Sequence, residues 1–118
     1  MSMTKREQTL KNEEGTGVLM RNGQELGAVL YSLKVTQEVH YLSSPAGFEP
    51  LPGLLSGLGE FKSAGQALPV TEGEELILRS EGGRERAIQI VTSFWGESGT
   101  FQLTQESAEE FNPEKRRV

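Results

Sequence analysis

The sequence predicts an all-β protein, built as a small antiparallel β-barrel or a tight sandwich of six to seven strands. Three observations lead to this prediction. Apolar and polar residues alternate with a period of two over residues 29–41, which a helix would not produce. Short apolar segments elsewhere are separated by glycine-containing turns rather than by helical patterns. A sheet of that size with one apolar face cannot stay open, so it must close on itself or fold over.

The first two strands form the clearest hairpin. Residues 18–21 are mainly apolar and are followed by Asn22-Gly23, which suits the two positive φ angles of a type I′ turn. The return strand places one set of residues on the expected buried face: Val29, Tyr31, Leu33, Val35, Val39 and Tyr41. The residues of the other parity are mostly polar, so we expect the opposite face to contact water.

The remaining strands are expected to be shorter. Residues 43–57 contain three prolines and three glycines, which predicts a loop rather than a regular strand or helix. A short strand is expected over residues 58–63. The other expected elements are a hairpin formed by residues 76–79 and 86–91 around Glu81-Gly82-Gly83, and a last strand over residues 101–103.

One β domain is expected over residues 15–104, between two tails. Residues 1–14 are polar and lack a core-facing stripe, so we expect them to form a mobile N-terminal tail. Residues 105–118 form the C-terminal tail. Within it, Ser107-Ala108-Glu109-Glu110 fits a capping box, which predicts one short helical turn before Pro113 ends it.

Composition argues against several kinds of site. The chain has no cysteine, one histidine and no aspartate among its 17 acidic residues, so we expect no disulfide, no metal site and no cofactor. Its net charge of −5 repels phosphate backbones and disfavours nucleic-acid binding. No apolar run is long enough to cross a bilayer, and the N-terminus lacks the apolar centre of a secretory signal. We therefore expect a cytoplasmic protein without a membrane segment.

The sequence contains no convincing catalytic group. His40 lies on the polar side of its strand beside Glu38, as is typical of solvated surface residues. Glutamates recur in adjacent pairs, but adjacent strand residues such as Glu74 and Glu75 point to opposite faces and would not converge. No serine has nucleophile-elbow spacing. We expect no enzymatic activity.

The candidate binding residues are apolar. Four lie in the expected loop over residues 43–57: Phe48, Leu51, Leu54 and Leu55. They are interpreted either as a plug that closes one barrel end or as a docking patch for a protein partner or a second copy. Trp95, at a turn before Gly96, is interpreted either as a core anchor, which we prefer, or as an aromatic contact at a rim. These residues predict a non-enzymatic protein-interaction module.

The alternative is a small barrel that binds an anionic small ligand. Arg79, Arg84 and Arg86 flank one turn, and their guanidinium groups together suit an anion. Glu81 and Glu85 are interleaved with them and would neutralise much of this charge. The sequence identifies neither the ligand nor the partner.

Overall fold

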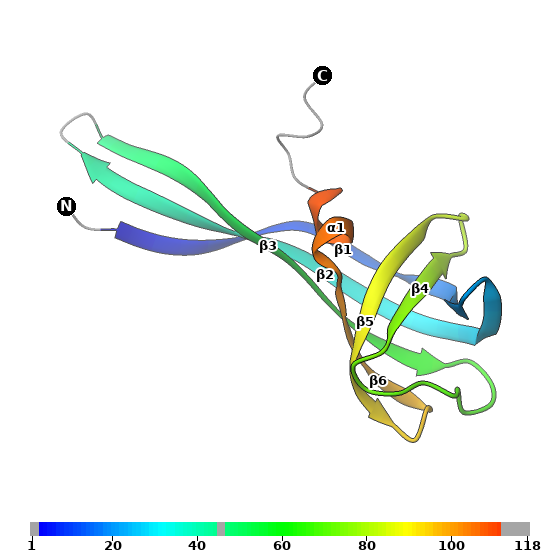
Figure 1. Cartoon of the computed structure of the whole chain (residues 1–118). Coiled ribbons are helices and arrows are strands. Elements are labelled where there is room, and N and C mark those ends of the chain that lie inside the picture. Colours follow the sequence, from blue (N-terminus) through cyan, green and yellow to red (C-terminus); the bar gives the residue numbers. More distant parts are fainter. Residues whose placement is uncertain (1–2, 45–46, 112–118) are drawn as a thin grey trace.

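In the computed structural model, which describes residues 3–44 and 47–111, six antiparallel strands form one closed sheet. Their order around the ring is β1-β2-β3-β6-β5-β4, and β4 pairs with β1 to close it. The elements are β1 (Met3–Arg21), β2 (Gln24–Ser44), β3 (Gly47–Ser63), β4 (Glu75–Ser80), β5 (Glu85–Phe94), β6 (Ser98–Leu103) and α1 (Gln105–Glu109) (Figure 1). The predicted mostly β fold with six to seven antiparallel strands is confirmed.

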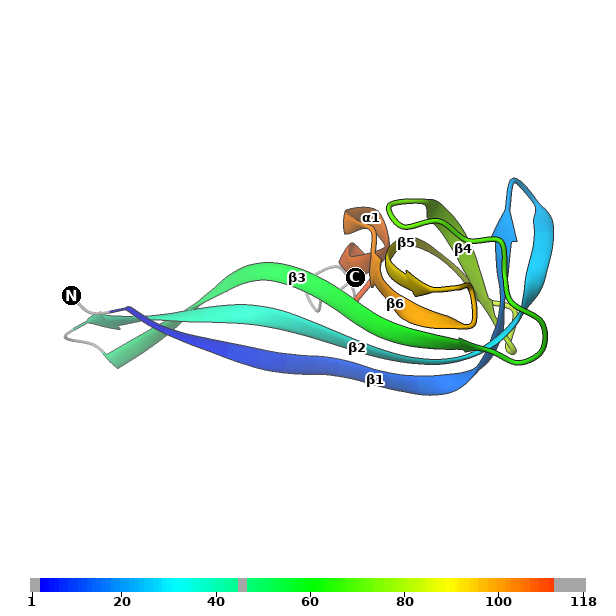
Figure 2. The same cartoon turned by 90° about the horizontal axis from the view of Figure 1, so that it is seen from below.

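The first three strands extend far beyond the ring. β4 pairs with β1 only over Gly17–Met20, and β6 pairs with β3 only over Leu58–Lys62. Beyond these contacts β1, β2 and β3 continue together as a three-stranded arm, which Figure 2 shows leaving the ring. The molecule is therefore elongated, with extents of 59 × 32 × 21 Å.

The arm corrects the expectation of an N-terminal tail over residues 1–14. Met3–Glu14 form the first part of β1 and pair with β2, from Met3 opposite Leu42 to Glu14 opposite Ser32. The side chains that are described here are mostly exposed. Hydrogen bonds to the backbone of β2 hold this segment as a strand, so it needs no core-facing apolar stripe.

The expectation of a loop over residues 43–57 is also wrong. Residues 43–44 end β2 and Gly47–Gly57 belong to β3, while residues 45–46 lie outside the described part. In the arm β3 is an edge strand, because β6 pairs with it only from Leu58 onward. An edge strand tolerates Pro50 and Pro52, since no neighbour on its open side requires their missing N–H groups.

The hydrophobic core lies inside the ring, where the alternation predicted for β2 is confirmed over residues 29–35. Thr36, which is expected on the wet face, is buried, and the side chain of Tyr41 lies outside the described part. Val29, Tyr31 and Leu33 are buried, whereas Leu30 and Lys34 between and beyond them are exposed. The other strands add further buried side chains to the same cluster, among them Leu19, Leu55, Phe61, Leu76, Leu78, Ile88, Ile90, Phe101 and Leu103.

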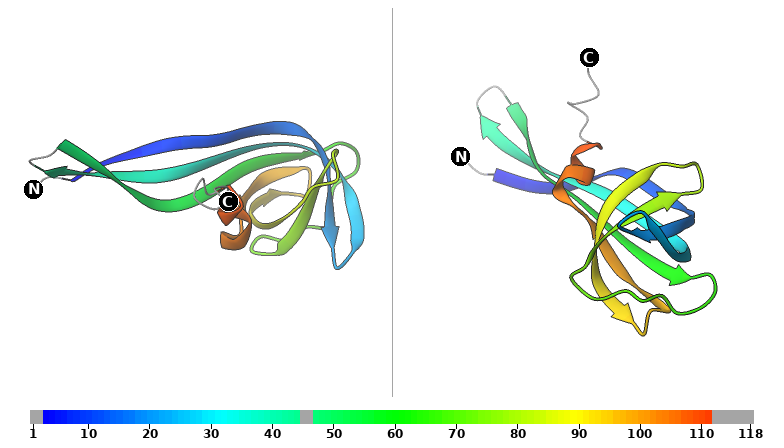
Figure 3. Two further views of the ribbon diagram at one scale, coloured as in Figure 1. Left: turned by 90° about the horizontal axis from the view of Figure 1, so that it is seen from above. Right: turned by 45° about the vertical axis from the view of Figure 1, so that its right-hand side comes forward.

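Helix α1 follows the last strand and confirms the predicted helical turn. Its N-cap is Thr104, whose hydroxyl accepts a hydrogen bond from the Ser107 N–H at 3.3 Å, so Ser107 is not the cap that the pattern predicted. Ala108 and Phe111 are buried and join the core at the end of the ring from which the arm leaves (Figure 3). Within the described residues, no helix is long and apolar enough to cross a membrane.

Candidate interaction surface

Large apolar side chains are exposed on the outer side of the ring. Among the described residues they are Leu30 (50% exposed), Leu58 (59%), Val91 (44%), Phe94 (60%) and Trp95 (91%). They come from β2, β3, β5 and the turn between β5 and β6. We call these five residues the apolar patch.

Cross-strand pairing places Leu30, Leu58 and Phe94 on one face of the sheet, which carries three rows of side chains, and Trp95 follows Phe94 in the turn. The Phe94 row consists of Leu30, Lys62, Ser98 and Phe94, each opposite the next on the neighbouring strand. The middle row consists of Ser32, Glu60, Thr100 and Thr92. The Leu58 row consists of Lys34, Leu58, Gln102 and Gln89. Val91 lies at a register shift in β5, between the middle row and the Leu58 row.

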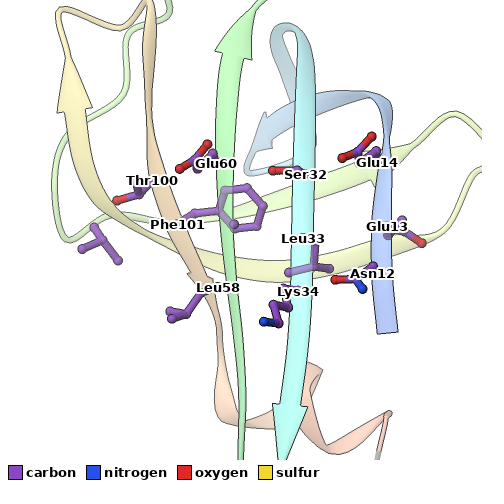
Figure 4. A pocket seen from close by; sticks show the side chains of 12 residues that line it. Asn12, Glu13, Glu14, Ser32, Leu33, Lys34, Leu58, Glu60, Thr100 and Phe101 are labelled. Carbon is purple, nitrogen blue, oxygen red and sulfur yellow. The ribbon is translucent and has the colours of Figure 1, made fainter. Parts of the chain in front are cut away.

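The middle row lies lower than the rows beside it, because most of its side chains are short. A hollow of about 630 Å³ is lined by Ser32, Glu60 and Thr100 and reaches Leu58 and Val91 (Figure 4). A second hollow, of about 430 Å³, shares the same three middle-row residues and reaches Leu30 and Phe94. The outer face therefore has raised apolar side chains on both sides of a depressed polar band.

Trp95 is presented by a tight turn with unusual geometry. Both Trp95 (φ 57°) and Gly96 (φ 73°) have left-handed backbone conformations, and the Glu97 N–H donates to the Phe94 carbonyl at 3.0 Å. A left-handed conformation is strained for a bulky side chain. The turn is held by the loop that precedes β4, because the Leu68 N–H donates to the Gly96 carbonyl at 2.9 Å. Tertiary contacts therefore fix the position from which Trp95 projects.

The preferred interpretation of Trp95 as a core anchor is wrong. Its side chain is 91% exposed, and the interior is filled by other residues, including Phe61 and Phe101. A residue at the first position of a turn that joins two strands projects beyond the sheet, so its side chain does not reach the core. The exposed position agrees with the second interpretation, an aromatic contact at a rim.

Of the other predicted docking residues, the structure describes only the side chain of Leu55. Leu55 is 5% exposed and belongs to the core. The side chains of Phe48, Leu51 and Leu54 lie outside the described part of the chain. Sequence reasoning missed Leu30 and Leu58, although each breaks the polar pattern on the outward side of its own strand.

The three arginines of the alternative hypothesis do not converge. Arg79 pairs with Glu25, and its side chain is 36% exposed. Arg86 points into the ring, where its side chain is 2% exposed and pairs with Glu13. Arg84 is exposed at the turn between β4 and β5. The structure therefore brings each of Arg79 and Arg86 to a carboxylate of the chain itself rather than to a shared anion site.

The pair of Arg86 and Glu13 is the centre of a buried polar cluster. Arg86 Nη2 donates to Glu13 Oε1 at 3.1 Å, the Tyr31 hydroxyl donates to Glu13 Oε2 at 2.9 Å, and the Phe111 ring covers the guanidinium at 5.1 Å. The hydrogen bond from Arg86 lowers the pKa of Glu13. Burial, followed by the hydrogen bond to Glu13, raises the pKa of Tyr31 to about 12. These contacts join β1, β2 and β5 to the segment after α1.

The described residues show no metal centre. Among them, no group of three or more histidine or glutamate side chains is placed to hold a metal ion. His40 lies in β2 opposite Leu51, and its side chain is outside the described part. Glu74 binds Arg21 through two hydrogen bonds, of 2.8 and 2.7 Å, and Glu75 is exposed. In comparisons with known proteins, no family model, curated protein or solved structure matches the chain.

Proposed function

We propose that the protein is a non-enzymatic protein-interaction module that binds through the apolar patch. The observation that carries this proposal is Trp95, which is 91% exposed and has a strained backbone beside the exposed ring of Phe94. Strained residues persist where the surrounding structure holds them, and they concentrate at functional sites. Tryptophan is also among the residues that contribute most to binding energy at protein interfaces.

The surroundings of Trp95 support the same role. The other patch residues lie on adjacent strands of the same face, so a partner would cover Leu30, Leu58 and Val91 together with the aromatic pair. Exposed apolar side chains gathered on one face mark interaction sites in soluble proteins. Because the turn is already held by Leu68, its backbone would lose little conformational freedom on binding.

The proposal moves the docking surface from the segment 43–57 to the outer face of the ring. It retains the cytoplasm as the proposed location, and a protein rather than a nucleic acid or a membrane as the partner. The net charge of −5 supports the choice of a protein partner over a phosphate backbone. In the described part of the chain Arg79 and Arg86 are each paired with a glutamate, so we prefer the protein-interaction module to the anion-binding alternative.

Site-specific photo-crosslinking tests the proposal. A photo-reactive amino acid replaces Phe94 or Leu58 in two variants, and Arg84 in a control variant, in the cells that express the protein naturally. Arg84 is exposed and lies near the opposite end of β5 from Phe94. We expect the Phe94 and Leu58 variants to form the same protein adduct, which the Arg84 control variant does not form. Equal adducts from all three positions, or none, would overturn the proposal.

A further inference from the structure

Among the described residues, the outer face carries unpaired charges of both signs, as does the turn between β4 and β5 with Arg84 and Glu85, whereas several other arginines of the ring pair with a glutamate. Away from the patch, Arg21 binds Glu74 at 2.7 Å, and Arg79 and Arg86 each pair with a glutamate. Glu60 and Lys62, which lie two residues apart on β3, are both exposed. Within the described part of the chain neither has an ion pair or a side-chain hydrogen bond. The face thus presents unpaired charges of both signs beside its apolar patch.

From this arrangement we propose that a second copy of the same chain binds the outer face and forms a two-fold symmetric dimer. The inference rests on the proposed function and names the partner. In an isologous interface the same surface of each copy must be complementary to itself. A surface that carries free carboxylate and ammonium groups side by side, as Glu60 and Lys62 do, meets this condition, whereas a surface of a single sign does not.

The spacing of the two charges defines the symmetry axis. Glu60 and Lys62 point to the same side of β3, about 7 Å apart. A two-fold axis that runs across β3 at Phe61, in the plane of the interface, places Glu60 of one copy opposite Lys62 of the other. Symmetry repeats the contact, so one axis creates two ion pairs at the centre of the dimer.

The same axis makes the apolar rows complementary. It places the Phe94 row of one copy against the middle row of the other. Leu30 then faces the partner's Ser32, and Phe94 faces the partner's Thr92. The raised side chains of one copy therefore enter the hollow of about 430 Å³ on the other. Complementary shape and complementary charge are produced by one symmetry operation.

A standard interface buries about 800 Å² on each partner. This area is close to a tenth of the 7712 Å² that the chain exposes. In the proposed dimer, the apolar side chains Leu30 and Phe94 lie on either side of the two central ion pairs.

Reciprocal charge exchange tests the dimer. Sedimentation equilibrium is measured for the wild type, for Glu60→Lys, for Lys62→Glu, and for an equal mixture of the two variants. We expect the wild type to dimerise and each variant alone to dissociate at least about tenfold more readily, because like charges then face each other. We expect the mixture to recover the wild-type affinity, because a dimer with one copy of each variant again has opposite charges at both contacts.

The matched controls are Arg84→Glu and Glu85→Lys, which make the same charge changes at exposed positions outside the patch. They should leave the dimer unchanged, alone and mixed. A wild type that stays monomeric at all concentrations, or a dimer whose affinity is unchanged by Glu60→Lys and Lys62→Glu, would overturn the inference. A crosslink from Phe94 and Leu58 to a different protein would then leave the proposed function standing. The absence of any adduct, including one between copies of this chain, would overturn both.

Discussion

Two turns of the ring share one backbone geometry but differ in what determines it. The turn between β1 and β2 contains Asn22 (φ 50°) and Gly23 (φ 81°), and the turn between β5 and β6 contains Trp95 (φ 57°) and Gly96 (φ 73°). Asparagine and glycine favour this geometry by themselves, whereas tryptophan does not. The first turn is therefore specified locally, and the second is specified by distant residues such as Leu68.

This difference teaches where to look for function in a protein of this kind. A turn that agrees with its own sequence needs no further explanation. A turn that holds a large aromatic residue in a strained and exposed position departs from its local preference, and such departures concentrate at functional sites. If distant contacts determine the second turn, changes at those contacts should matter more than changes at local ones.

The largest effect is expected from alanine at the two glycines. A Cβ atom at Gly96 would lie 2.1 Å from the Leu68 carbonyl oxygen, whereas a Cβ at Gly23 would meet nothing within 4 Å. Gly23→Ala should lower the free energy of unfolding by about 1–2 kcal/mol, which is the cost of holding an alanine in the left-handed conformation. Gly96→Ala should cost about 2 kcal/mol more, because the Leu68 backbone must also move. Chemical denaturation measures the free energy of unfolding of both variants. Equal losses of stability would contradict the claim that contacts with Leu68 determine the second turn.

Ion pairs extend the comparison from the backbone to side chains. Glu13→Gln leaves the Arg86 guanidinium buried without a negative partner, and should destabilise the fold by about 3 kcal/mol at pH 7. Glu25→Gln removes the exposed partner of Arg79 and should cost less than about 1 kcal/mol.

The pH dependence of stability tests whether the charge of Glu13 causes the stability difference between wild type and Glu13→Gln. Arg86 lowers the pKa of Glu13 below its ordinary value of 4.5, so the stabilisation is present above pH 4.5 and is lost as pH falls through the folded-state pKa. The difference in unfolding free energy between wild type and Glu13→Gln should therefore shrink in acid. A difference that stays constant down to the acid unfolding transition would show that packing, not charge, is responsible.

The features that could be predicted from the sequence are those with local causes, and the features that could not be predicted depend on distant contacts. The Asn22-Gly23 turn and the buried positions Val29, Tyr31 and Leu33 were predictable, because turn chemistry and alternation are local signals. The arm was not, since its first strand lacks an apolar stripe and its third contains Pro50 and Pro52. Both strands are held by pairing with β2, which no local pattern reveals.

The candidate surface was predictable only in part, for the same reason. Trp95 attracted attention as an aromatic residue in a turn, but its exposure depends on the contact between Gly96 and Leu68. Leu30 and Leu58 become neighbours of Phe94 only through the pairing of four strands. The partner of Arg86 could not be predicted from its neighbours in sequence, because Glu13 lies 73 residues away.

Ionisation of Tyr31 should produce a smaller change in stability, and this change should be a loss as the pH rises. Its raised folded-state pKa of about 12 means that the unfolded chain releases the phenol proton first, near pH 10. The stabilisation is therefore present below pH 10 and is lost as pH rises towards 12. In a Tyr41→Phe background, ultraviolet absorbance should show ionisation of Tyr31 near pH 12 while circular dichroism still reports the folded sheet. Ionisation near pH 10 in the folded protein would exclude the buried hydrogen bond to Glu13.

The smallest expected change in stability comes from exchanging the distinctive residues of the two turns. Trp95→Asn replaces a strained residue with one that tolerates the left-handed conformation, so the protein should become more stable by up to about 1 kcal/mol. Asn22→Trp should cost a similar amount, because nothing in the first turn compensates for the strain. Both are measured by thermal unfolding, with association followed in parallel. Trp95→Asn should weaken the dimer while Asn22→Trp leaves it unchanged, since only Trp95 borders the interface. A large loss of stability in Trp95→Asn would mean that the indole supports the fold, and the strain at this turn would then need no function to explain it.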